Sequence, residues 1–349
     1  MDLINKFLNL VAPPFTFFAL LLFLPPFQLY KFFLSILRSV FPEKVAGKVV
    51  LITGASSGIG EHLAYEYARR GARLALSARR ENLLSEVADR ARKLGSPDVV
   101  TVRADVANVD DCKRFVEEAF NHFGRLDHLV NNAGISHACI LEEVEDVTNL
   151  RPVMDINFWG SVYATQFAAP HLRSSRGKIV VLSSSSSWLP APGMAIYNAS
   201  KAAMVALFET LRIEFGHDIH ITLVAPGFVE SEFTQGKYLE KDGKLTFDPE
   251  MRDVQVGAVP IARVEGCAKA IVNSVCRGYR YVTQPAWFRV TYIWKLFCPE
   301  VIEWIYRMMY LSGPGASAKG AMSKKISDLT GPKKVVYPDT VQSAELKTD

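Results

Sequence analysis

Tyr197 and Lys201 are the two residues of this sequence whose types and spacing most directly offer chemistry. They lie four positions apart at the start of an amphipathic stretch, so a helix there places both side chains on one face, one turn apart. A free tyrosine has a pKa of about 10 and is a poor base at neutral pH, but a nearby ammonium group favours its phenolate form. The pair could therefore exchange a proton with a substrate oxygen. A tyrosine and a lysine at this spacing usually occur by chance, so the surrounding elements must decide.

The elements that would position this pair alternate between strands and helices. Tyr197 follows the fifth of six short apolar runs that are typical of buried strands. This alternation favours an α/β fold with a doubly wound parallel sheet, a Rossmann-like architecture. Because Tyr197 follows a strand of such a sheet, a catalytic role for the Tyr197–Lys201 pair is favoured over a chance occurrence of this spacing. The expected strands are 49–53, 73–78, 99–104, 128–131, 178–183 and 220–225, with helical patterns at 61–70, 81–93 and 109–123.

A glycine-rich turn follows the first expected strand. It carries Gly54, Gly58 and Gly60 and leads directly into a helical pattern. Without side chains at these positions, a pyrophosphate can approach the helix N-terminus, where free amides and the helix dipole favour anions. The turn alone is weak evidence, because a tight turn between a strand and a helix can have the same sequence. Together with the alternating elements it predicts a dinucleotide cofactor.

The end of the second expected strand bears on the choice of cofactor. An acidic residue there would hold the ribose 2′-hydroxyl of NAD, whereas this chain has Arg79 and Arg80, which suit the 2′-phosphate of NADP(H). Arg79 is the stronger candidate, because Arg80 could equally begin a solvated helix. We therefore expect NADP(H) as the cofactor.

Several motifs together resemble those of the short-chain dehydrogenase/reductase family over about residues 46–285. The spacing Thr53-Gly54-x3-Gly58-Ile59-Gly60 is similar to the family's cofactor motif, and residues 131–134 to its Asn-Asn-Ala-Gly motif. One departure is Ser57, where NADP-preferring members often have a basic residue. Besides the two arginines, the cofactor-binding residues that the resemblance implies are Gly54, Ser56, Ser57, Gly58, Ile59, Gly60, Asp105, Val106, Asn132, Ala133, Gly134, Tyr197, Lys201, Pro226, Gly227, Val229 and Ser231.

The same resemblance assigns catalytic roles. Tyr197 would be the acid and base for the substrate oxygen, and Lys201 would lower its pKa and hold the nicotinamide ribose. Ser184, thirteen residues before Tyr197, would donate a hydrogen bond to the substrate, although the run of five serines at 183–187 leaves the register open. Asn157 would support a water link to the lysine. Ser231 stands where the family usually has a threonine hydroxyl near the nicotinamide.

The expected substrate side is apolar. It comprises the segment 188–194, with Trp188 and Met194, and the variable segment from 228 to about 261. Such a lining favours a bulky hydrophobic substrate over a sugar or a small acid. Trp188 and Met194 could equally be ordinary packing residues.

The N-terminal segment from residue 7 to residue 30 has no charged side chain and is long enough to cross a hydrocarbon core. A cleaved signal peptide is disfavoured, because the segment lacks a compact basic start and a small-residue cleavage site. Pairs of prolines at 13–14 and 25–26 leave two interpretations open. One is a distorted spanning helix, and the other is a bent segment in one leaflet or in a lipid-droplet monolayer. The lysines and arginines that follow place the larger part of the chain in the cytosol.

The segment between Trp287 and Tyr310 is rich in aromatic residues with basic residues interspersed, a mixture typical of membrane interfaces. The alternative is a helix packed on the core or at the interface of a homodimer. The following residues are polar and predict a flexible tail. The expected division is therefore an anchor at 1–45, a catalytic domain at 46–285, an aromatic extension at 286–312 and a tail at 313–349.

Composition excludes some classes of function. A net charge of +4, with both signs interspersed, does not resemble the concentrated basic face of a nucleic-acid binder. The five cysteines are widely spaced and form no Cys-x2-Cys motif, so we expect reduced thiols and no metal site.

The layout of anchor, reductase domain and aromatic extension is similar to that of the plant steroleosins, oil-body proteins related to 11β-hydroxysteroid dehydrogenases. The resemblance implies a hydroxysteroid substrate and a lipid-droplet or endoplasmic-reticulum location. Two alternatives stay open. One is a reductase of long-chain ketones such as 3-ketosphinganine at the endoplasmic reticulum, and the other is a sterol-binding droplet coat protein without turnover.

Overall fold

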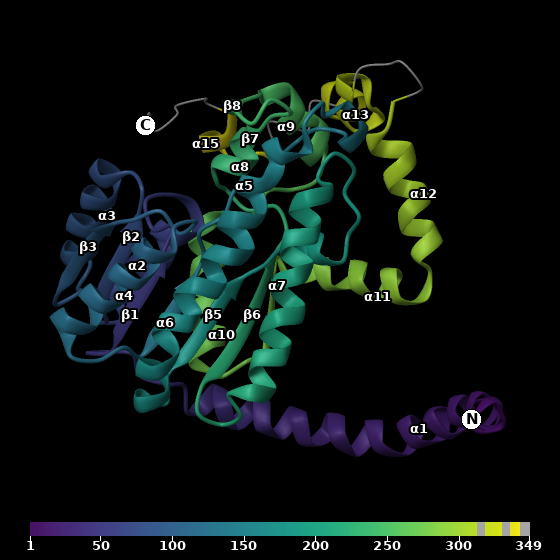
Figure 1. Ribbon diagram of the computed structural model, residues 1–349, viewed down its shortest axis with the longest axis horizontal. Coiled ribbons are helices and arrows are strands. Elements are labelled where there is room, and N and C mark those ends of the chain that lie inside the picture. Colours follow the sequence, from purple (N-terminus) through teal and green to yellow (C-terminus); the bar gives the residue numbers. More distant parts are fainter. Residues whose placement is uncertain (313–317, 330–335, 343–349) are drawn as a thin grey trace.

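A seven-stranded, fully parallel sheet forms the centre of the computed structural model, which describes residues 1–312, 318–329 and 336–342 (Figure 1). The strand order is β3-β2-β1-β4-β5-β6-β9, so the doubly wound architecture expected from the sequence is confirmed. The strand β9 was not predicted, because its run of four residues at the edge of the sheet has no distinctive pattern. The strands are β1 (Val49–Thr53), β2 (Arg73–Ala78), β3 (Val99–Arg103), β4 (His128–Asn131), β5 (Lys178–Leu182), β6 (His220–Pro226) and β9 (Tyr281–Gln284).

Helices cover both faces of the sheet. Side chains alternate along a strand, so Val50 and Ile52 of β1 face one layer of helices while Val49 and Leu51 face the other. All four are fully buried, as expected for a parallel sheet with both faces covered. The first layer comprises α2 (Gly58–Arg69), α3 (Glu81–Lys93) and α10 (Val264–Cys276), and the second comprises α4 (Val109–Phe123), α6 (Gly160–Ser175) and α7 (Ala195–Glu214).

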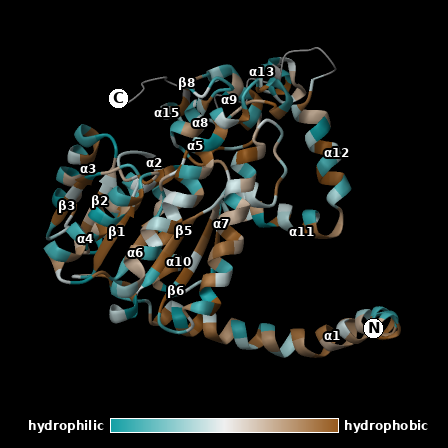
Figure 2. Ribbon diagram, viewed as in Figure 1, coloured by the Kyte–Doolittle hydropathy of each residue, from teal (hydrophilic) through white to brown (hydrophobic). Residues whose placement is uncertain are grey.

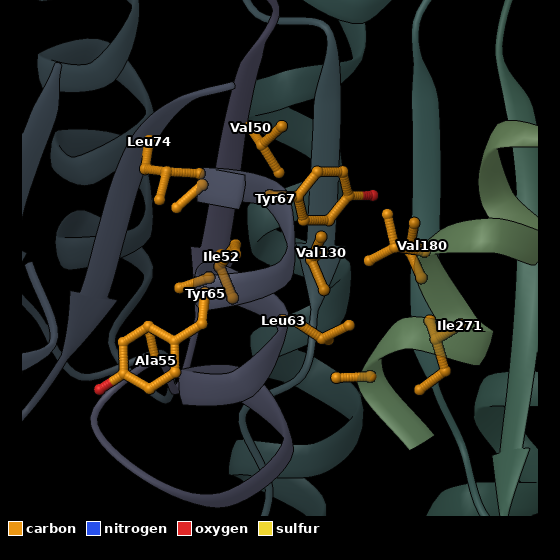
Figure 3. Packing of buried hydrophobic residues seen from close by; sticks show 14 of the residues in the cluster. Val50, Ile52, Ala55, Leu63, Tyr65, Tyr67, Leu74, Val130, Val180 and Ile271 are labelled. Atoms are coloured by element: carbon orange, nitrogen blue, oxygen red, sulfur yellow. The ribbon is translucent and has the colours of Figure 1, made fainter. Parts of the chain in front are cut away.

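Figure 3 shows the core of the first layer, where Leu63 and Tyr67 of α2 and Ile271 of α10 lie over Val130 and Val180 of the sheet. This packing fixes the start of α2, and with it the glycine turn, relative to the end of β1.

Most of the smaller elements lie beyond the carboxyl ends of the strands, and the helices Arg289–Phe297 and Pro299–Tyr310 run beside the domain (Figure 1). The smaller elements include a short antiparallel hairpin and several single-turn helices that were not predicted. These elements are α5 (Arg151–Met154), a π-helix (Asp155–Trp159), α8 (Glu232–Gln235), β7 (Lys237–Leu239), β8 (Leu245–Phe247), α9 (Pro249–Val256), α11 (Arg289–Phe297), α12 (Pro299–Tyr310), α13 (Met322–Leu329), α15 (Asp339–Gln342) and 3₁₀ turns at 141–143, 147–150, 185–187, 286–288 and 318–320.

The N-terminal segment is one continuous helix, α1 (Asp2–Val40), that projects away from the domain (Figures 1 and 2). None of its residues is buried, and it is long and apolar enough to cross a membrane. All four prolines lie inside it, and the chain does not turn back on itself. Its last turns contact the domain, where the Ser35 hydroxyl lies 3.0 Å from that of Tyr279 and Arg38 donates to the carbonyl of Gly278.

Part of the segment expected to be a flexible tail is folded. The Tyr337 hydroxyl donates to the carbonyl of Gly257 at 2.7 Å, and Ser323 donates to the carbonyl of Val254. Tyr337 and Val341 pack against the apolar residues Val256 and Ile261, at and after the end of α9. The sequence did not predict this packing, because the two residues are isolated apolar positions in a polar segment. The predicted flexible tail is therefore wrong for residues 318–329 and 336–342; residues 313–317, 330–335 and 343–349 lie outside the described part.

Candidate active site

A cavity of about 640 Å³ lies at the carboxyl edge of the sheet. Its floor is formed where β1 and β4 lie side by side, although they are separated in sequence by β2 and β3. Ligands of doubly wound sheets bind at this reversal of strand order, because the loops after the two strands diverge there.

The glycine turn lies against the loop that follows β4. Gly54 and Gly58 have positive φ angles of 64° and 57°, which favour glycine, and both line the cavity. Gly60 does not line it. A Cβ atom there would lie 2.4 Å from the side-chain nitrogen of Asn132, so close packing explains this glycine rather than room for a pyrophosphate.

Thr53 and Asn132 tie the two strand ends together. The Asn132 side chain donates to the carbonyls of Thr53 and Gly54 at 3.0 and 3.1 Å, and the Thr53 hydroxyl accepts from the amides of Asn132 and Ala133. Asn132 therefore braces the glycine turn as well as lining the cavity.

Both arginines after β2 line the cavity. Arg79 is exposed, whereas Arg80 is half-buried and donates to the hydroxyl groups of Ser57 at 2.8 Å and Ser56 at 3.3 Å. Arg80 does precede α3, as the helix-start alternative supposed, but its guanidinium lies over the glycine turn. The remaining predicted cofactor residues that line the cavity are Ile59, Asp105, Val106, Ala133, Gly134, Tyr197, Lys201, Pro226, Gly227, Val229 and Ser231.

Ser184 lies beside Tyr197. Burial raises the pKa of Tyr197 above its usual range, and a hydrogen bond from Ser184 opposes this rise. The neighbouring Ser183 also lines the cavity, but its hydroxyl donates to the backbone carbonyl of Lys201 at 2.9 Å. Of these two serines, Ser184 is therefore the one whose side chain is hydrogen-bonded to Tyr197.

Lys201 lies under Tyr197 on the next turn of α7. Its Nζ atom is 5.8 Å from the centroid of the Tyr197 ring and donates to the carbonyl of Leu182 at 2.8 Å. The side chain is buried, and burial lowers the pKa of Lys201 to about 8. A cation thus lies close to the phenol at neutral pH.

Asn157 is fully buried and does not line the cavity. It lies in the π-helix between α5 and α6, a local widening that often occurs at functional sites. Its side chain accepts from the amide of Ile135 at 2.8 Å and donates to Ser200 on α7 at 2.9 Å. Asn157 therefore connects the loop after β4 to the helix that carries Tyr197 and Lys201.

Of the three predicted substrate residues, Ser184 and Met194 line the cavity and Trp188 does not. The Trp188 indole donates to Thr291 of α11 at 2.9 Å and packs edge-on against Tyr292. Trp188 thus packs the C-terminal extension onto the domain. This is the second of the two roles that the sequence left open for it.

Several cavity residues were not predicted individually. Phe233 of α8 lies parallel to the Tyr197 ring at a centroid distance of 6.1 Å. Tyr306 and Tyr310 belong to the aromatic extension, which the sequence suggested as a lipid contact, yet they line the cavity. The only feature of the sequence that sets Tyr306 and Tyr310 apart is that they belong to a cluster of aromatic residues. Other apolar residues of the wall are Leu189, Phe228, Leu245 and Phe288.

Comparisons with known sequences agree with this geometry. The sequence model of the short chain dehydrogenase family matches residues 48–242, which is more than half of the chain. The "11-beta-hydroxysteroid dehydrogenase A" of Sesamum indicum is 66% identical over 349 residues, and "11-beta-hydroxysteroid dehydrogenase 1A" of Arabidopsis thaliana is 59% identical. Both alignments cover the whole of both chains.

Solved structures share the fold. A short chain dehydrogenase/reductase from Burkholderia phymatum in complex with NAD has a TM-score of 0.63 and 26% identity, covering 75% of this chain and 96% of its own. An alcohol dehydrogenase from Thermococcus sibiricus complexed with 5-hydroxy-NADP has a TM-score of 0.56 and 26% identity, covering 68% and 94%. The two neighbours thus carry different dinucleotides.

Proposed function

The chain belongs to the short-chain dehydrogenase family, and from this premise we propose that it interconverts a hydroxyl group and a ketone on a hydroxysteroid, with NADP(H), at a lipid surface. One observation carries the proposal. Tyr197, Ser184 and Lys201 line one cavity together with the glycine turn and a set of apolar and aromatic side chains.

The side chains suit proton transfer at the substrate oxygen. In oxidation, the hydroxyl proton passes to the phenolate oxygen of Tyr197 while the carbon–hydrogen bond breaks and the C=O bond forms. A nicotinamide cofactor held by the glycine turn would supply the acceptor for the hydride and its electron pair in oxidation, and the hydride donor in reduction. Ser184 donates a hydrogen bond to the reacting oxygen, and the Lys201 ammonium stabilises the phenolate.

The residues present fit a dinucleotide. A Cβ atom on Gly54 would lie 2.7 Å from the Cα atom of Ala133, so the turn approaches the next loop as closely as glycine allows. The free amides at the start of α2 follow directly and favour a pyrophosphate. Arg79 and Arg80 at the adjoining strand end support the choice of the phosphorylated form.

Replacing Arg79 by alanine should weaken NADPH binding about tenfold, because a charge-assisted hydrogen bond to the 2′-phosphate is lost. NADH, which lacks this phosphate, should bind almost as before. Calorimetric dissociation constants for both cofactors would test this. Arg69→Ala, which removes an exposed arginine of α2, is the matched control. An equal loss for NADPH and NADH would refute the assignment.

The steroid proposal is supported by the names of the full-length plant relatives and by the apolar wall. It is tested with full-length protein in detergent, both cofactors, and a panel of hydroxysteroids and long-chain ketones. Turnover of hydroxysteroids would support the proposal, whereas turnover of long-chain ketones alone would favour the 3-ketosphinganine alternative. Binding of sterols without any turnover would favour a coat protein.

We further propose that α1 anchors the chain in lipid, with the catalytic domain in the cytosol and a lipid droplet as the main location. At 39 residues α1 is roughly 58 Å long, well beyond the hydrocarbon thickness of a bilayer. A droplet monolayer has no second aqueous face, so α1, one continuous helix in the structure, would have to bend at its prolines or lie along the surface to be held there. Internal prolines weaken a straight spanning helix, because each removes an amide donor and leaves a carbonyl without its partner.

Changing Pro13, Pro14, Pro25 and Pro26 to leucine should therefore move the protein from droplets to bilayers and lower the droplet-associated fraction by roughly half or more. Fluorescence imaging and fractionation of oil-storing cells would measure this fraction. Leucine in place of Phe15, Phe18, Phe23 and Phe27 keeps the prolines and serves as the control. An unchanged droplet fraction in the proline variant would rule out their role in targeting.

A further inference from the structure

Arg80 and Glu232, which both line the cavity, form an ion pair beside the glycine turn. Arg80 follows β2 and Glu232 begins α8, so the pair joins positions 152 residues apart. The nearest nitrogen and oxygen atoms are 2.5 Å apart, and the side chains are 19% and 25% exposed. A partly buried pair is screened less by solvent than an exposed one. Glu232 therefore competes with any other anion that binds the guanidinium of Arg80.

The start of α8 also lies against the glycine turn. A Cβ atom on Gly58 would be 3.4 Å from the Cβ atom of Ser231, the residue before Glu232. Arg80 donates from its second terminal nitrogen to Ser57 and Ser56 of the same turn. Glu232 is thus held over the place where the cofactor's adenosine half is proposed to bind.

We propose that Glu232 is a specificity-determining residue, whose carboxylate competes with the 2′-phosphate of NADP(H) for Arg80. This inference rests on the proposed use of NADP(H). One terminal nitrogen of Arg80 donates to Glu232 and the other to the two serines, so a phosphate that approaches these nitrogens meets a carboxylate already paired with the guanidinium. Glu232 is the partner displaced, because it is an anion and repels the phosphate.

Arg80 also explains the departure at position 57. Where NADP-preferring relatives often have a basic residue in the glycine turn, this chain has Ser57, and the Arg80 guanidinium lies 2.8 Å from the Ser57 hydroxyl. The cation therefore reaches the same place from the neighbouring strand end. The ion pair with Glu232 lowers the affinity of Arg80 for the 2′-phosphate.

Lys237 makes the exchange feasible. Its Nζ atom lies 3.6 Å from the other carboxylate oxygen of Glu232. When Arg80 turns to the phosphate, Glu232 therefore keeps a cation beside it, and the exchange leaves no unpaired charge in a half-buried site.

Calorimetry on full-length protein in detergent tests the competition, with NADPH and NADH as ligands. Glu232→Gln should tighten NADPH binding about threefold to tenfold, because it removes both the competitor and the repulsion, and should change NADH binding less than about twofold. In an Arg80→Gln background the same change should alter NADPH binding less than about twofold, because the contested cation is absent.

Glu118→Gln is the matched control, since it removes one carboxylate that pairs with Arg114 on α4, away from the cavity. Its NADPH affinity should equal that of the unchanged protein. The competition is refuted if Glu232→Gln shifts NADPH and NADH equally, or if its effect persists at full size without Arg80. If the unchanged protein prefers NADH, the proposed cofactor choice fails, but the change in the NADPH-to-NADH ratio still decides the role of Glu232.

Discussion

Replacing Tyr197 by phenylalanine is expected to lower kcat by about 10² to 10⁴-fold, the range that a positioned acid and base contributes. The substitution removes only the hydroxyl group that exchanges a proton with the substrate oxygen. The ring that lies parallel to Phe233 and above Lys201 stays in place. Binding of NADPH should therefore remain within about twofold of its original value. Steady-state kinetics with a hydroxysteroid and a fluorescence titration of NADPH measure the two quantities separately.

Tyr281→Phe provides the control for this experiment. Its hydroxyl group donates to Glu209 on the surface of the domain, away from the cavity. Loss of that hydroxyl should leave kcat unchanged. Residual turnover in Tyr197→Phe within tenfold of the original protein would show that another group supplies the proton.

The sheet could be predicted closely because most of its strands are buried on both faces. Val49–Thr53, Arg73–Ala78 and His128–Asn131 have the bounds that their apolar runs predict, and two others end one residue earlier. Burial on both faces makes such runs continuous and easy to recognise. The edge strand Tyr281–Gln284 has only four residues and its first residue is exposed, so the run is too short to show the pattern of a strand.

The site could be predicted where a motif fixes local geometry, and not where distant segments meet. The spacing of Tyr197 and Lys201 on one helix face follows from helical periodicity alone. Trp188, by contrast, was expected to face the substrate, but its partner Thr291 lies 103 positions away. The contact between Arg80 and Glu232 likewise depends on the fold that brings β2 and α8 together.

Lys201 is expected to act mainly through Tyr197, and its replacement by methionine tests this link. Methionine keeps the length of the buried side chain but removes the cation that lies 5.8 Å from the tyrosine ring. Burial already raises the pKa of Tyr197, so loss of the cation should raise this pKa further and lower the rate of oxidation at neutral pH by about 10²-fold or more.

The pH dependence separates this mechanism from simple cofactor binding. Burial lowers the pKa of Lys201 to about 8, so in the original protein its charge favours the phenolate at neutral pH and fades as the pH rises above that value. Oxidation needs the phenolate and therefore increases with pH. In Lys201→Met the increase of the oxidation rate should begin at higher pH, so that the rate partly recovers when the pH is raised. Lys201→Arg keeps a cation at every pH, so its rate should increase over nearly the same pH range as that of the original protein. Profiles of kcat/KM against pH for the three proteins measure these shifts. If Lys201→Met lowers the rate by the same factor at every pH, the lysine serves to hold the cofactor and does not tune Tyr197.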